Sequence, residues 1–461
     1  MSGLLLLLIV WGVLPGPVWP QAQEAGFVAL QRDGKIVATA SGGFAVARYL
    51  PDGSLDPSFG RGGKVVTQLG TARRVGDKFF IYDGAGFVVL QEDGKIVAAG
   101  RSDKSLAVVR YLPNGDVDPS FGTEGKVKTW LGAAEGLDDE LHALALQADG
   151  KIVAVGRAWQ QYSNDIAVVR FNADGTLDSS FGDEGKVTTN FPEPGPPNAS
   201  SPGPTSGYGL GSKDTAHSSG PPPASGPMKG QYGYDDAFAV GIQADGKLVV
   251  GGTSLVRYNP DGTLDTSFGS GGRVMTEVHA LVLQRDDKIV VVGAAGAFAL
   301  ARYNSDGTLD ASFGVGGTVT TKFGKVDEAG SMALQVDGKL VVVGKSFNGR
   351  SVGLAMARYN PDGTLDTSFG KEGRVTSDSC AYQVEERFAN IIAFSSLPGS
   401  WRGILQADGK IVVRGFPMTA LCPASMLLRY NPDGSVDGIF GQSGRVTTVF
   451  LDNMALFIPA T

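Results

Sequence analysis

The chain has 461 residues, of which 67 are glycine, 42% are hydrophobic and 19% are charged, and its formal net charge is −7. The glycines follow no strict three-residue period, which excludes a collagen helix, and the high apolar content at small net charge excludes wholesale disorder. The excess of Asp and Glu over Lys and Arg, 47 against 40, with no basic cluster, excludes a surface built for nucleic acid.

The N-terminal segment has the pattern of a secretory signal peptide. An apolar run from Leu4 to Leu14 is followed by Pro15, Pro17 and Pro20, and residues 1–22 carry no charged side chain. The run is short for a bilayer span, which takes about 20 residues. We therefore expect a signal peptide over residues 1–22, a protein that is secreted or held at the cell surface, and no membrane span after cleavage. An uncleaved lipid-facing anchor and a wrongly assigned start are the alternatives.

Three phrases recur in the same order seven times along the rest of the chain. They read Leu-Gln-x-Asp-Gly-Lys, then Arg-Tyr-Asn-Pro-Asp-Gly-x-Leu-Asp-x-Ser-Phe-Gly, then Gly-Lys-Val-Thr-Thr, with small variations. Self-similarity at a fixed period is the signature of a repeat architecture. The Gln of the first phrase stands at Gln31, Gln91, Gln147, Gln243, Gln284, Gln335 and Gln406.

Each repeat predicts four short strands. In the first repeat, Asp33-Gly34 separates two apolar runs, and this is the strongest short signal for a hairpin because its turn needs positive φ. We expect strands at 28–31, 35–39, 44–49 and 64–67. Four antiparallel strands at a period of about 40–60 residues describe a propeller blade. The sequence therefore predicts an all-β, seven-bladed propeller over residues 23–461.

The two ends of the array predict how the ring closes. The N-terminal copy begins at the second strand of the unit, and the C-terminal copy ends with an unpaired strand at 445–450. We expect strands from the two termini to pair in one blade, which would close the ring. The alternative is an open solenoid, which would need capping repeats that the sequence does not show.

The three phrases resemble the delta-60 repeat family of bacterial proteins, over about residues 27–450. The resemblance implies a β-propeller fold and an extracellular location, and it supplies no catalytic residue. Two local departures stand out. Asp287 replaces the hairpin Gly of the fifth repeat, and Gly438-Ile439 replaces the usual residue-Ser pair of the seventh.

Each repeat also carries an Arg and, eight residues later, an Asp. In the fifth repeat the Arg shares its side of the strand with apolar residues, so it needs a partner. We predict a bidentate, structural ion pair across the turn; seven ligand-binding carboxylates are the alternative. The pairs are Arg48 with Asp56, Arg110 with Asp118, Arg170 with Asp178, Arg257 with Asp265, Arg302 with Asp310, Arg358 with Asp366 and Arg429 with Asp437.

The segment 259–265 places oxygen-bearing side chains at alternate positions, as a calcium loop does, but lacks the bidentate Glu of a complete loop. A turn with Asx-type hydrogen bonds explains the same residues. We expect no cofactor and no metal, and calcium is the alternative.

Antiparallel strands place their connections alternately on two faces of a ring. The repeated phrases form the turns of one face, named here the uniform face, and the connections of variable length and sequence form the other, the variable face. The variable face includes a Pro/Gly-rich insertion at 192–230, predicted to be a disordered excursion, and a second loop insertion at 377–402. Repeat arrays often bind through the face that carries insertions.

Aromatic and charged residues gather in the variable connections, and they predict a binding surface for a glycan or a protein partner. The alternative is that the Trp side chains fill gaps between blades and the acids solubilise loops. His142 and His279 fall in non-adjacent blades and are interpreted as strand-end polar residues. The candidate binding residues are Trp130, Trp159, Tyr162, Trp401, Asp83, Asp139, Asp235, Asp327, Arg101, Arg157 and Lys345.

The leading functional hypothesis is a monomeric, non-enzymatic binding module or scaffold. The chain has no Gly-x-Ser-x-Gly elbow, no Walker loop and no HExxH motif, so no catalytic residue is assigned. One alternative is a propeller hydrolase or lactonase with carboxylates at the mouth of the channel, with or without calcium. Another alternative is a structural component of the envelope.

The two cysteines, Cys380 and Cys422, fall in the two variable connections of one blade. In a secreted protein this placement predicts a disulfide. Thiol titration of the denatured, unreduced protein is expected to find no free thiol, and reduction should then release both. Two free thiols before reduction would contradict the pairing.

Overall fold

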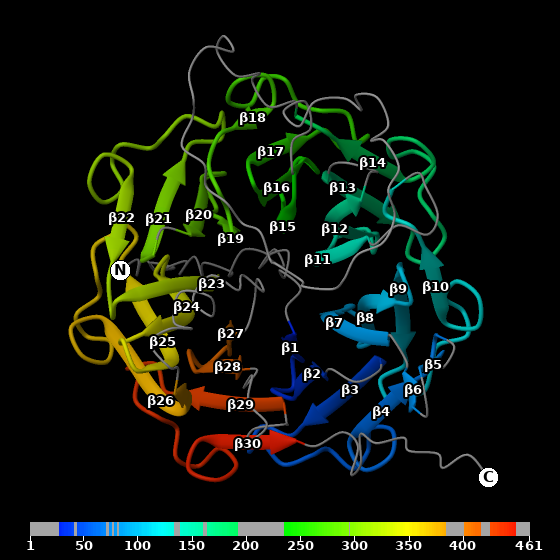
Figure 1. The fold of residues 1–461 in the computed structure, drawn as a ribbon, viewed down its shortest axis with the longest axis horizontal. Helices are drawn as coiled ribbons and strands as arrows, with labels where there is room; N and C mark the ends of the chain where they lie inside the picture. The colour runs from blue at the N-terminus through cyan, green and yellow to red at the C-terminus, as the bar shows by residue number, and fades with distance from the viewer. Residues whose placement is uncertain are drawn as a thin grey trace, which may run out of the picture.

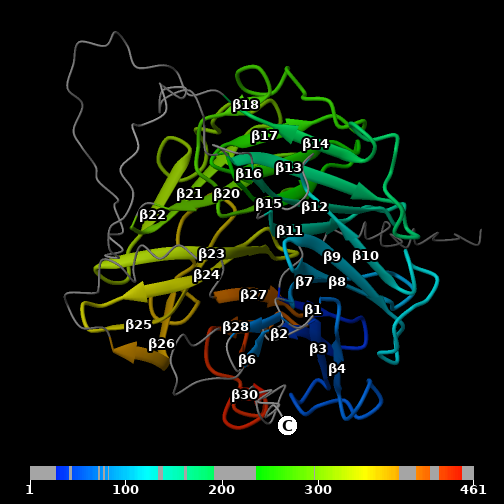
Figure 2. The same ribbon diagram turned by 45° about the vertical axis from the view of Figure 1, so that its right-hand side comes forward.

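The structure, a computed structural model, describes residues 27–40, 44–70, 73–75, 78–80, 83–132, 139–159, 164–191, 235–294, 296–383, 401–415 and 425–448. These residues form seven four-stranded antiparallel sheets arranged as the blades of a ring, which confirms the predicted fold (Figure 1). The first strands of successive blades contact one another around the centre, and the fourth strands lie at the periphery (Figures 1 and 2).

The first four blades follow the chain from the N-terminal side. Blade 1 contains β1 (Val28–Leu30), β2 (Ile36–Ala40), β3 (Phe44–Tyr49) and β4 (Lys64–Thr67). Blade 2 contains β7 (Asp83–Leu90), β8 (Ile96–Ser102), β9 (Ser105–Tyr111) and β10 (Lys126–Thr129). Blade 3 contains β11 (Glu140–Leu146), β12 (Ile152–Trp159), β13 (Asn164–Phe171) and β14 (Lys186–Thr189). Blade 4 contains β15 (Ala237–Ile242), β16 (Leu248–Gly252), β17 (Leu255–Tyr258) and β18 (Arg273–Val274).

The other three blades complete the ring. Blade 5 contains β19 (Ala280–Leu283), β20 (Ile289–Ala294), β21 (Phe298–Tyr303) and β22 (Thr318–Thr321). Blade 6 contains β23 (Val326–Leu334), β24 (Leu340–Phe347), β25 (Ser351–Tyr359) and β26 (Arg374–Gln383). Blade 7 contains β27 (Trp401–Leu405), β28 (Ile411–Gly415), β29 (Ser425–Tyr430) and β30 (Arg445–Thr448). A separate pair, β5 (Arg73–Val75) and β6 (Lys78–Phe80), lies in the connection between blades 1 and 2.

The Asp-Gly hairpins form as the turn chemistry predicts. Gly34 adopts φ +82°, and its N–H donates to the Gln31 carbonyl at 2.9 Å. In the fifth repeat Asp287 takes the same position with φ 60°, because Asp tolerates the left-handed region better than most residues. This departure from the repeat therefore leaves the turn intact.

The hydrophobic core lies between blades. Seven separate clusters of buried side chains occur, and each draws residues from two neighbouring blades. Strand β20 is covered on both faces, since Ile289, Val290, Val291 and Val292 are all buried. Each blade is therefore stabilised mainly by its two neighbours.

The predicted closure by terminal strands is wrong for the described residues. Strand β30 pairs with β29, and β1 pairs with β2, so each terminal blade takes all four strands from one continuous segment. The Gly-Lys-Val-Thr-Thr strand pairs with the strand before it because the connection between them returns to the end of that preceding strand. In blade 1 the Arg48 N–H donates to Gly63 O and the Asp56 N–H donates to Arg48 O, both at 2.9 Å.

Blades 7 and 1 close the ring through side chains and turns. The Gly441 N–H donates to Asp52 O at 2.8 Å, and the Arg429 guanidinium donates to Pro51 O. The Tyr49 hydroxyl donates to Thr448 Oγ1 at 2.7 Å, and burial raises the pKa of Tyr49 to about 12, which keeps that hydroxyl protonated.

The second predicted insertion, 377–402, begins later than expected. Strand β26 continues to Gln383, which pairs with Ser351, so residues 377–383 extend the blade. The insertion at 192–230, the signal segment 1–22 and the rest of the second insertion lie outside the described residues, apart from Trp401 and Arg402 at the start of β27.

The predicted pairing of each repeat Arg with its Asp occurs in all seven blades, but it is not bidentate. Arg257 Nε donates to Asp265 Oδ2 at 2.8 Å, and the other six Nε–Oδ2 distances are 2.7–2.8 Å. A second guanidinium nitrogen, Nη1, donates to a backbone carbonyl of the next blade, as in Arg170 to Pro260 O at 2.6 Å. The guanidinium also lies over the repeat Phe, 4.4–4.8 Å from the ring centroid.

The Asp of each pair is held ionised. Burial alone would raise the pKa of Asp56, but hydrogen bonds from Ser58 and the charges of Arg48 and Lys35 outweigh it and lower the pKa to about 2. Asp118 and Asp178 reach the same value for similar reasons. The ion pairs therefore persist through the ordinary pH range.

We predict that Asp265→Ala lowers the free energy of unfolding by about 2–4 kcal/mol, because it leaves the Arg257 cation buried without its counter-ion. Denaturant unfolding measures the change. The control is Asp245→Ala at the hairpin of the same blade, where the side chain is 57% exposed, and a change within about 0.5 kcal/mol is expected. Equal effects of the two substitutions would contradict a structural role for the pair.

Candidate functional site

A β-bulge shapes the inner strand of several blades where it starts at the variable face. The pairing register shifts between Leu141 and Ala143 in β11 and between Ala237 and Ala239 in β15, and similar shifts occur in β7 and β23. The extra residues are His142 in blade 3 and Phe238 in blade 4. A bulge re-aims a side chain, and bulges are common next to functional sites.

A glycine in the neighbouring strand makes room for the bulge. An added Cβ at Gly156 would lie 1.9 Å from the Glu140 carbonyl oxygen, and one at Gly252 would lie 1.7 Å from that of Asp236. Both distances are far shorter than van der Waals contact. The glycine that ends the Lys-Ile-Val-x-Val-Gly run of the repeat is therefore required by the strand facing it.

The bulged side chains of His142 and Phe238 form an aromatic row with His279 of blade 5. The Phe238 ring lies 5.1 Å from the ring of His142 and 6.0 Å from that of His279, between centroids. His142 Nδ1 lies 2.9 Å from Ala237 O, and His279 Nδ1 lies 3.3 Å from Ala329 O, so each imidazole reaches the next blade. The two histidines lie in non-adjacent blades, as predicted, and Phe238 stands between their rings.

Charged side chains surround the His142 end of this row. Arg157 Nη2 lies 2.9 Å from Glu140 Oε1, and Arg157 Nη1 lies 4.0 Å from Asp236 Oδ2 of blade 4. A hydrogen bond from His142, with the charge of Arg157, lowers the pKa of Glu140 to about 2. Burial raises the pKa of Asp236, although the charge of Arg157 and a hydrogen bond from Asn164 oppose it.

The strand register adds two more residues to the same side of blade 3. Glu140 pairs with Arg157, and Trp159 pairs with Asn164, so all four project from the face of blade 3 that meets blade 4. Asn164 is only 4% exposed, whereas Trp159 is 36% exposed at the end of β12. We name this group the blade 3–4 seam: Glu140, His142, Arg157, Asn164, Asp236 and Phe238, with Trp159 at its rim.

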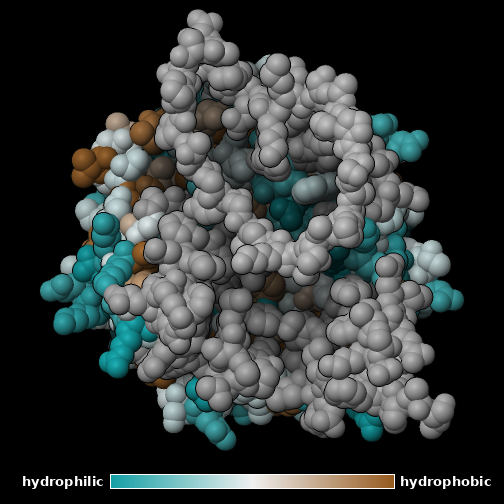
Figure 3. All heavy atoms as spheres, viewed as in Figure 1, coloured by the Kyte–Doolittle hydropathy of each residue, from teal (hydrophilic) through white to brown (hydrophobic). Residues whose placement is uncertain are grey.

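Three buried polar atoms of the seam have no hydrogen-bond partner within the described residues: Arg157 Nε, Asn164 Oδ1 and Asp236 Oδ1. Figure 3 shows hydrophilic atoms, in teal, in a recess near the middle of the face seen in Figure 1, in the region of β11 and β15. A buried polar atom without a partner is costly, at about 1–3 kcal/mol. The seam therefore holds two acceptors and one donor whose hydrogen-bonding capacity the described residues leave unused.

Three of the acids predicted for the binding surface are buried, whereas a ligand-binding carboxylate must be accessible. Asp139 accepts hydrogen bonds from the backbone N–H groups of Leu131, Gly132 and Trp159. Asp235 and Asp327 bind the backbone at the ends of the preceding outer strands in the same way. All three are at most 3% exposed. Their carboxylates hydrogen-bond to the backbone of the connections between blades and are not presented to a ligand.

The predicted aromatic and basic residues divide between packing and the seam. Trp401 is 7% exposed and packs in the cluster between blades 6 and 7, as the packing alternative expected, while Trp130 is half-buried after β10. Arg157 and Trp159 belong to the seam. Lys345 forms an ion pair with Glu328 at 2.9 Å, and Arg101 Nε donates to Asp103 O at 2.6 Å.

Four further predicted residues cannot be placed by their side chains. Asp83 and Cys380 lie in strands whose side chains there are outside the described set, and Tyr162 and Cys422 lie outside the described residues. The disulfide prediction therefore stays a prediction.

Glu140, Asp236 and Phe238 of the seam were not among the binding residues predicted from the sequence. A usable signal exists: an acidic residue stands seven positions before the repeat Gln in four successive repeats, at Glu140, Asp236, Glu277 and Glu328. The predicted acids stand eight positions before the repeat Gln, and Asp139, Asp235 and Asp327 bind backbone N–H groups. Only the bulge reveals which neighbour faces the seam.

The described residues contain no group of three or more His, Cys, Asp or Glu side chains that could hold a metal ion. In the segment 259–265, Asp261 Oδ1 accepts from the N–H and hydroxyl of Thr263 at 2.9 and 2.7 Å. These contacts are those of an Asx-type turn. No helix in the described part of the chain has the length and apolarity that crossing a bilayer requires.

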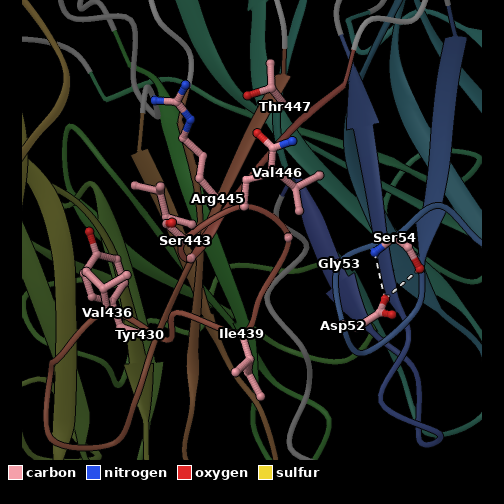
Figure 4. Close-up of a pocket in the computed structure, with 14 residues that line it drawn as sticks. Asp52, Gly53, Ser54, Tyr430, Val436, Ile439, Ser443, Arg445, Val446 and Thr447 are labelled. Carbon is pink, nitrogen blue, oxygen red and sulfur yellow. Dashed lines mark hydrogen bonds between the residues drawn. The ribbon is translucent and has the colours of Figure 1, made fainter.

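A pocket of about 770 Å³ lies far from the seam, between blades 7 and 1 on the uniform face (Figure 4). Its carboxylate, Asp52, is occupied by the N–H and hydroxyl of Ser54 at 2.8 and 2.7 Å. Ile439, where six repeats have Ser, is 77% exposed beside it. None of its lining residues is among the buried side chains that lack a hydrogen-bond partner in the described part of the chain, so the seam is the preferred site.

Seven segments match the family model described as a domain of unknown function (DUF5122) beta-propeller, and each runs from the repeat Gln to the repeat Phe. They are residues 31–59, 91–121, 147–181, 243–268, 284–313, 335–369 and 406–440. No curated protein matches the chain.

Several solved structures are similar in fold at low identity. A protein from Lactobacillus plantarum is 14% identical with a TM-score of 0.48, covering 92% of this chain and 96% of that one. Virginiamycin B lyase from Staphylococcus aureus is 10% identical with a TM-score of 0.42, covering 85% and 95%. The PQQ-bound aldose sugar dehydrogenase from Streptomyces coelicolor is 12% identical with a TM-score of 0.33, covering 78% and 92%. Similarities this weak carry no conclusion about the activity of this chain.

We predict that Gly156→Ala destabilises the protein by about 1–3 kcal/mol, because the new methyl group collides with the Glu140 carbonyl and forces the bulge to move. Thermal or denaturant unfolding measures the loss. Gly438→Ala is the control, since its methyl group meets nothing within 4 Å. If the two substitutions have the same effect, the bulge does not depend on the glycine.

Proposed function

We propose that this chain, built from seven repeats of a β-propeller repeat family, is a secreted or cell-surface binding module that recognises its ligand through the variable face. The proposal treats the protein as non-enzymatic and monomeric, in keeping with the delta-60 resemblance, which supplies no catalytic residue. The apolar N-terminal run supports the location.

The observation that carries the proposal is the contrast between repeated and unrepeated charges. The repeated Arg and Asp side chains satisfy one another inside every blade, and the repeated Lys adds a further ion pair to the same Asp at 2.9–3.4 Å. The unrepeated residues of the seam retain unpartnered buried atoms. Sevenfold repetition fits a structural role, whereas recognition of one ligand needs an asymmetric site of this kind.

A hydrolase is the second candidate, and one observation favours it. Glu140 and Asp236 flank Arg157, and their pKa values shift in opposite directions. Paired carboxyl groups whose pKa values are moved apart by their surroundings are the arrangement that general acid–base catalysis uses. Release of smaller products from a bound ligand, lost in Glu140→Gln, would favour this candidate.

The location of binding can be tested by site-specific photo-crosslinking in the native cells. A benzophenone amino acid at position 277, where the Glu277 side chain is 54% exposed at the start of blade 5, is expected to form adducts with cell-surface or extracellular material. The control position is 336, where Val336 is 90% exposed on a uniform-face hairpin, and no adduct is expected there. Adducts from position 336 alone, or from neither position, would contradict binding through the variable face.

A further inference from the structure

The ligand class of the seam follows from its three unpartnered atoms, and this step rests on the proposed function. Asn164 is the most informative residue because it is 4% exposed and its Oδ1 has no partner, although Asp236 takes a hydrogen bond from the same side chain. Among the described residues of the seam, the unpartnered set is two acceptors, Asn164 Oδ1 and Asp236 Oδ1, and one donor, Arg157 Nε. A ligand that satisfies all three must both donate and accept.

The charges of the seam narrow the chemical class of the ligand further. A cation would meet the acceptors but would be repelled by Arg157 and would leave its Nε–H unsatisfied. An anion would meet Arg157 but would face the carboxylates of Glu140 and Asp236, which lie 2.9 and 4.0 Å from the guanidinium. Because Coulomb repulsion is strong in a partly desolvated site, both charged classes are disfavoured. A neutral molecule with several hydroxyl groups meets all three atoms, since each hydroxyl both donates and accepts.

The rim supplies a surface for the apolar side of such a molecule. Trp159 is 36% exposed at the end of β12, on the side of blade 3 that carries Arg157 and Asn164. An indole ring offers a large, rigid apolar face at little cost in conformational entropy. A sugar ring has one face of C–H groups and a periphery of hydroxyl groups, which matches an aromatic rim above a polar recess.

We propose that the blade 3–4 seam binds a neutral carbohydrate, with Trp159 under a sugar ring and with Arg157, Asn164 and Asp236 bonded to its hydroxyl groups. Glu140 and His142 act as positioning residues. Glu140 holds the Arg157 guanidinium, and His142 ties β11 to the backbone of blade 4. Blade 6 lacks this combination, because it has a Glu328–Lys345 ion pair in place of Glu140–Arg157 but Gly330 in place of the bulged aromatic ring.

The test is a saccharide array probed with the full chain. The array carries neutral oligosaccharides of glucose, galactose, mannose and N-acetylglucosamine, together with uronic-acid and sulfated saccharides and with glucosamine oligomers. We expect a neutral saccharide to bind. Asn164→Leu is expected to weaken its binding about tenfold, the equivalent of one hydrogen bond worth about 1.4 kcal/mol, and Trp159→Ala about as much.

Matched variants keep the result interpretable. Glu328→Gln, at the corresponding pair of blade 6, should bind as the parent protein does. Trp159→Ala changes a rim residue and provides the readout if Asn164→Leu fails to fold, as judged by its unfolding temperature. Seam-dependent binding of a charged saccharide, neutral binding that both seam variants leave unchanged, or no binding to the array would overturn the inference. Crosslinking from position 277 without saccharide binding would overturn only this inference, whereas crosslinking confined to position 336 would overturn the proposed function.

Discussion

The ring depends on one buried guanidinium per blade. Each repeat Arg binds the Asp eight residues on, covers the repeat Phe and donates to a backbone carbonyl of the next blade. A neighbouring glycine N–H adds a second bond across the same interface, as in Gly182 to Asp261 O at 2.8 Å. The residue that neutralises the charge inside a blade thus also sets the spacing between blades. Its cost of burial is offset because Nε and Nη1 each find an acceptor in all seven blades.

This interaction explains why the ring closes without sharing strands between its ends. The interface between blades 7 and 1 repeats the contacts of the other six, with Arg429 reaching Pro51 O and Gly441 reaching Asp52 O. A hydrophobic cluster from both blades completes it. Closure is then one more copy of a contact made six times along the chain, so each terminal blade can be built from one continuous segment.

The regular repetition of the ion pairs distinguishes residues that hold the fold together from residues that are candidates for binding. The repeated charged residues satisfy one another, and the acids predicted as ligands, Asp139, Asp235 and Asp327, prove to be buried acceptors for backbone N–H groups. The binding site that we propose lies where blades 3 and 4 meet. There a bulge brings His142 and Phe238 together and leaves Asn164, Arg157 and Asp236 with unused hydrogen-bonding atoms.

Much of the fold could be read from the residues because its determinants are local. The Asp-Gly hairpins, the Arg and Asp spaced by eight residues, and the count of seven blades each depend on neighbours within a few positions. The bidentate geometry of the ion pair was wrong because the nearest competing acceptor, such as Pro260 O for Arg170, is 90 residues away. The structural role of Asp139 was not predicted because its partners are the backbone N–H groups of Leu131, Gly132 and Trp159, and backbone groups leave no side-chain signature in a sequence.

The sequence by itself determined the four-stranded blade, the turns within it and the number of blades. Only the tertiary structure decided which strands share a blade at the termini and which acids meet across a seam. Glu140 and Asp236 are 96 positions apart, and their approach to Arg157 depends on a bulge accommodated by Gly156 and on the packing of β11 against β15. Local pattern sets the direction of a side chain along one strand, but a contact between blades is set by the register and spacing of two sheets, and no short segment contains that information.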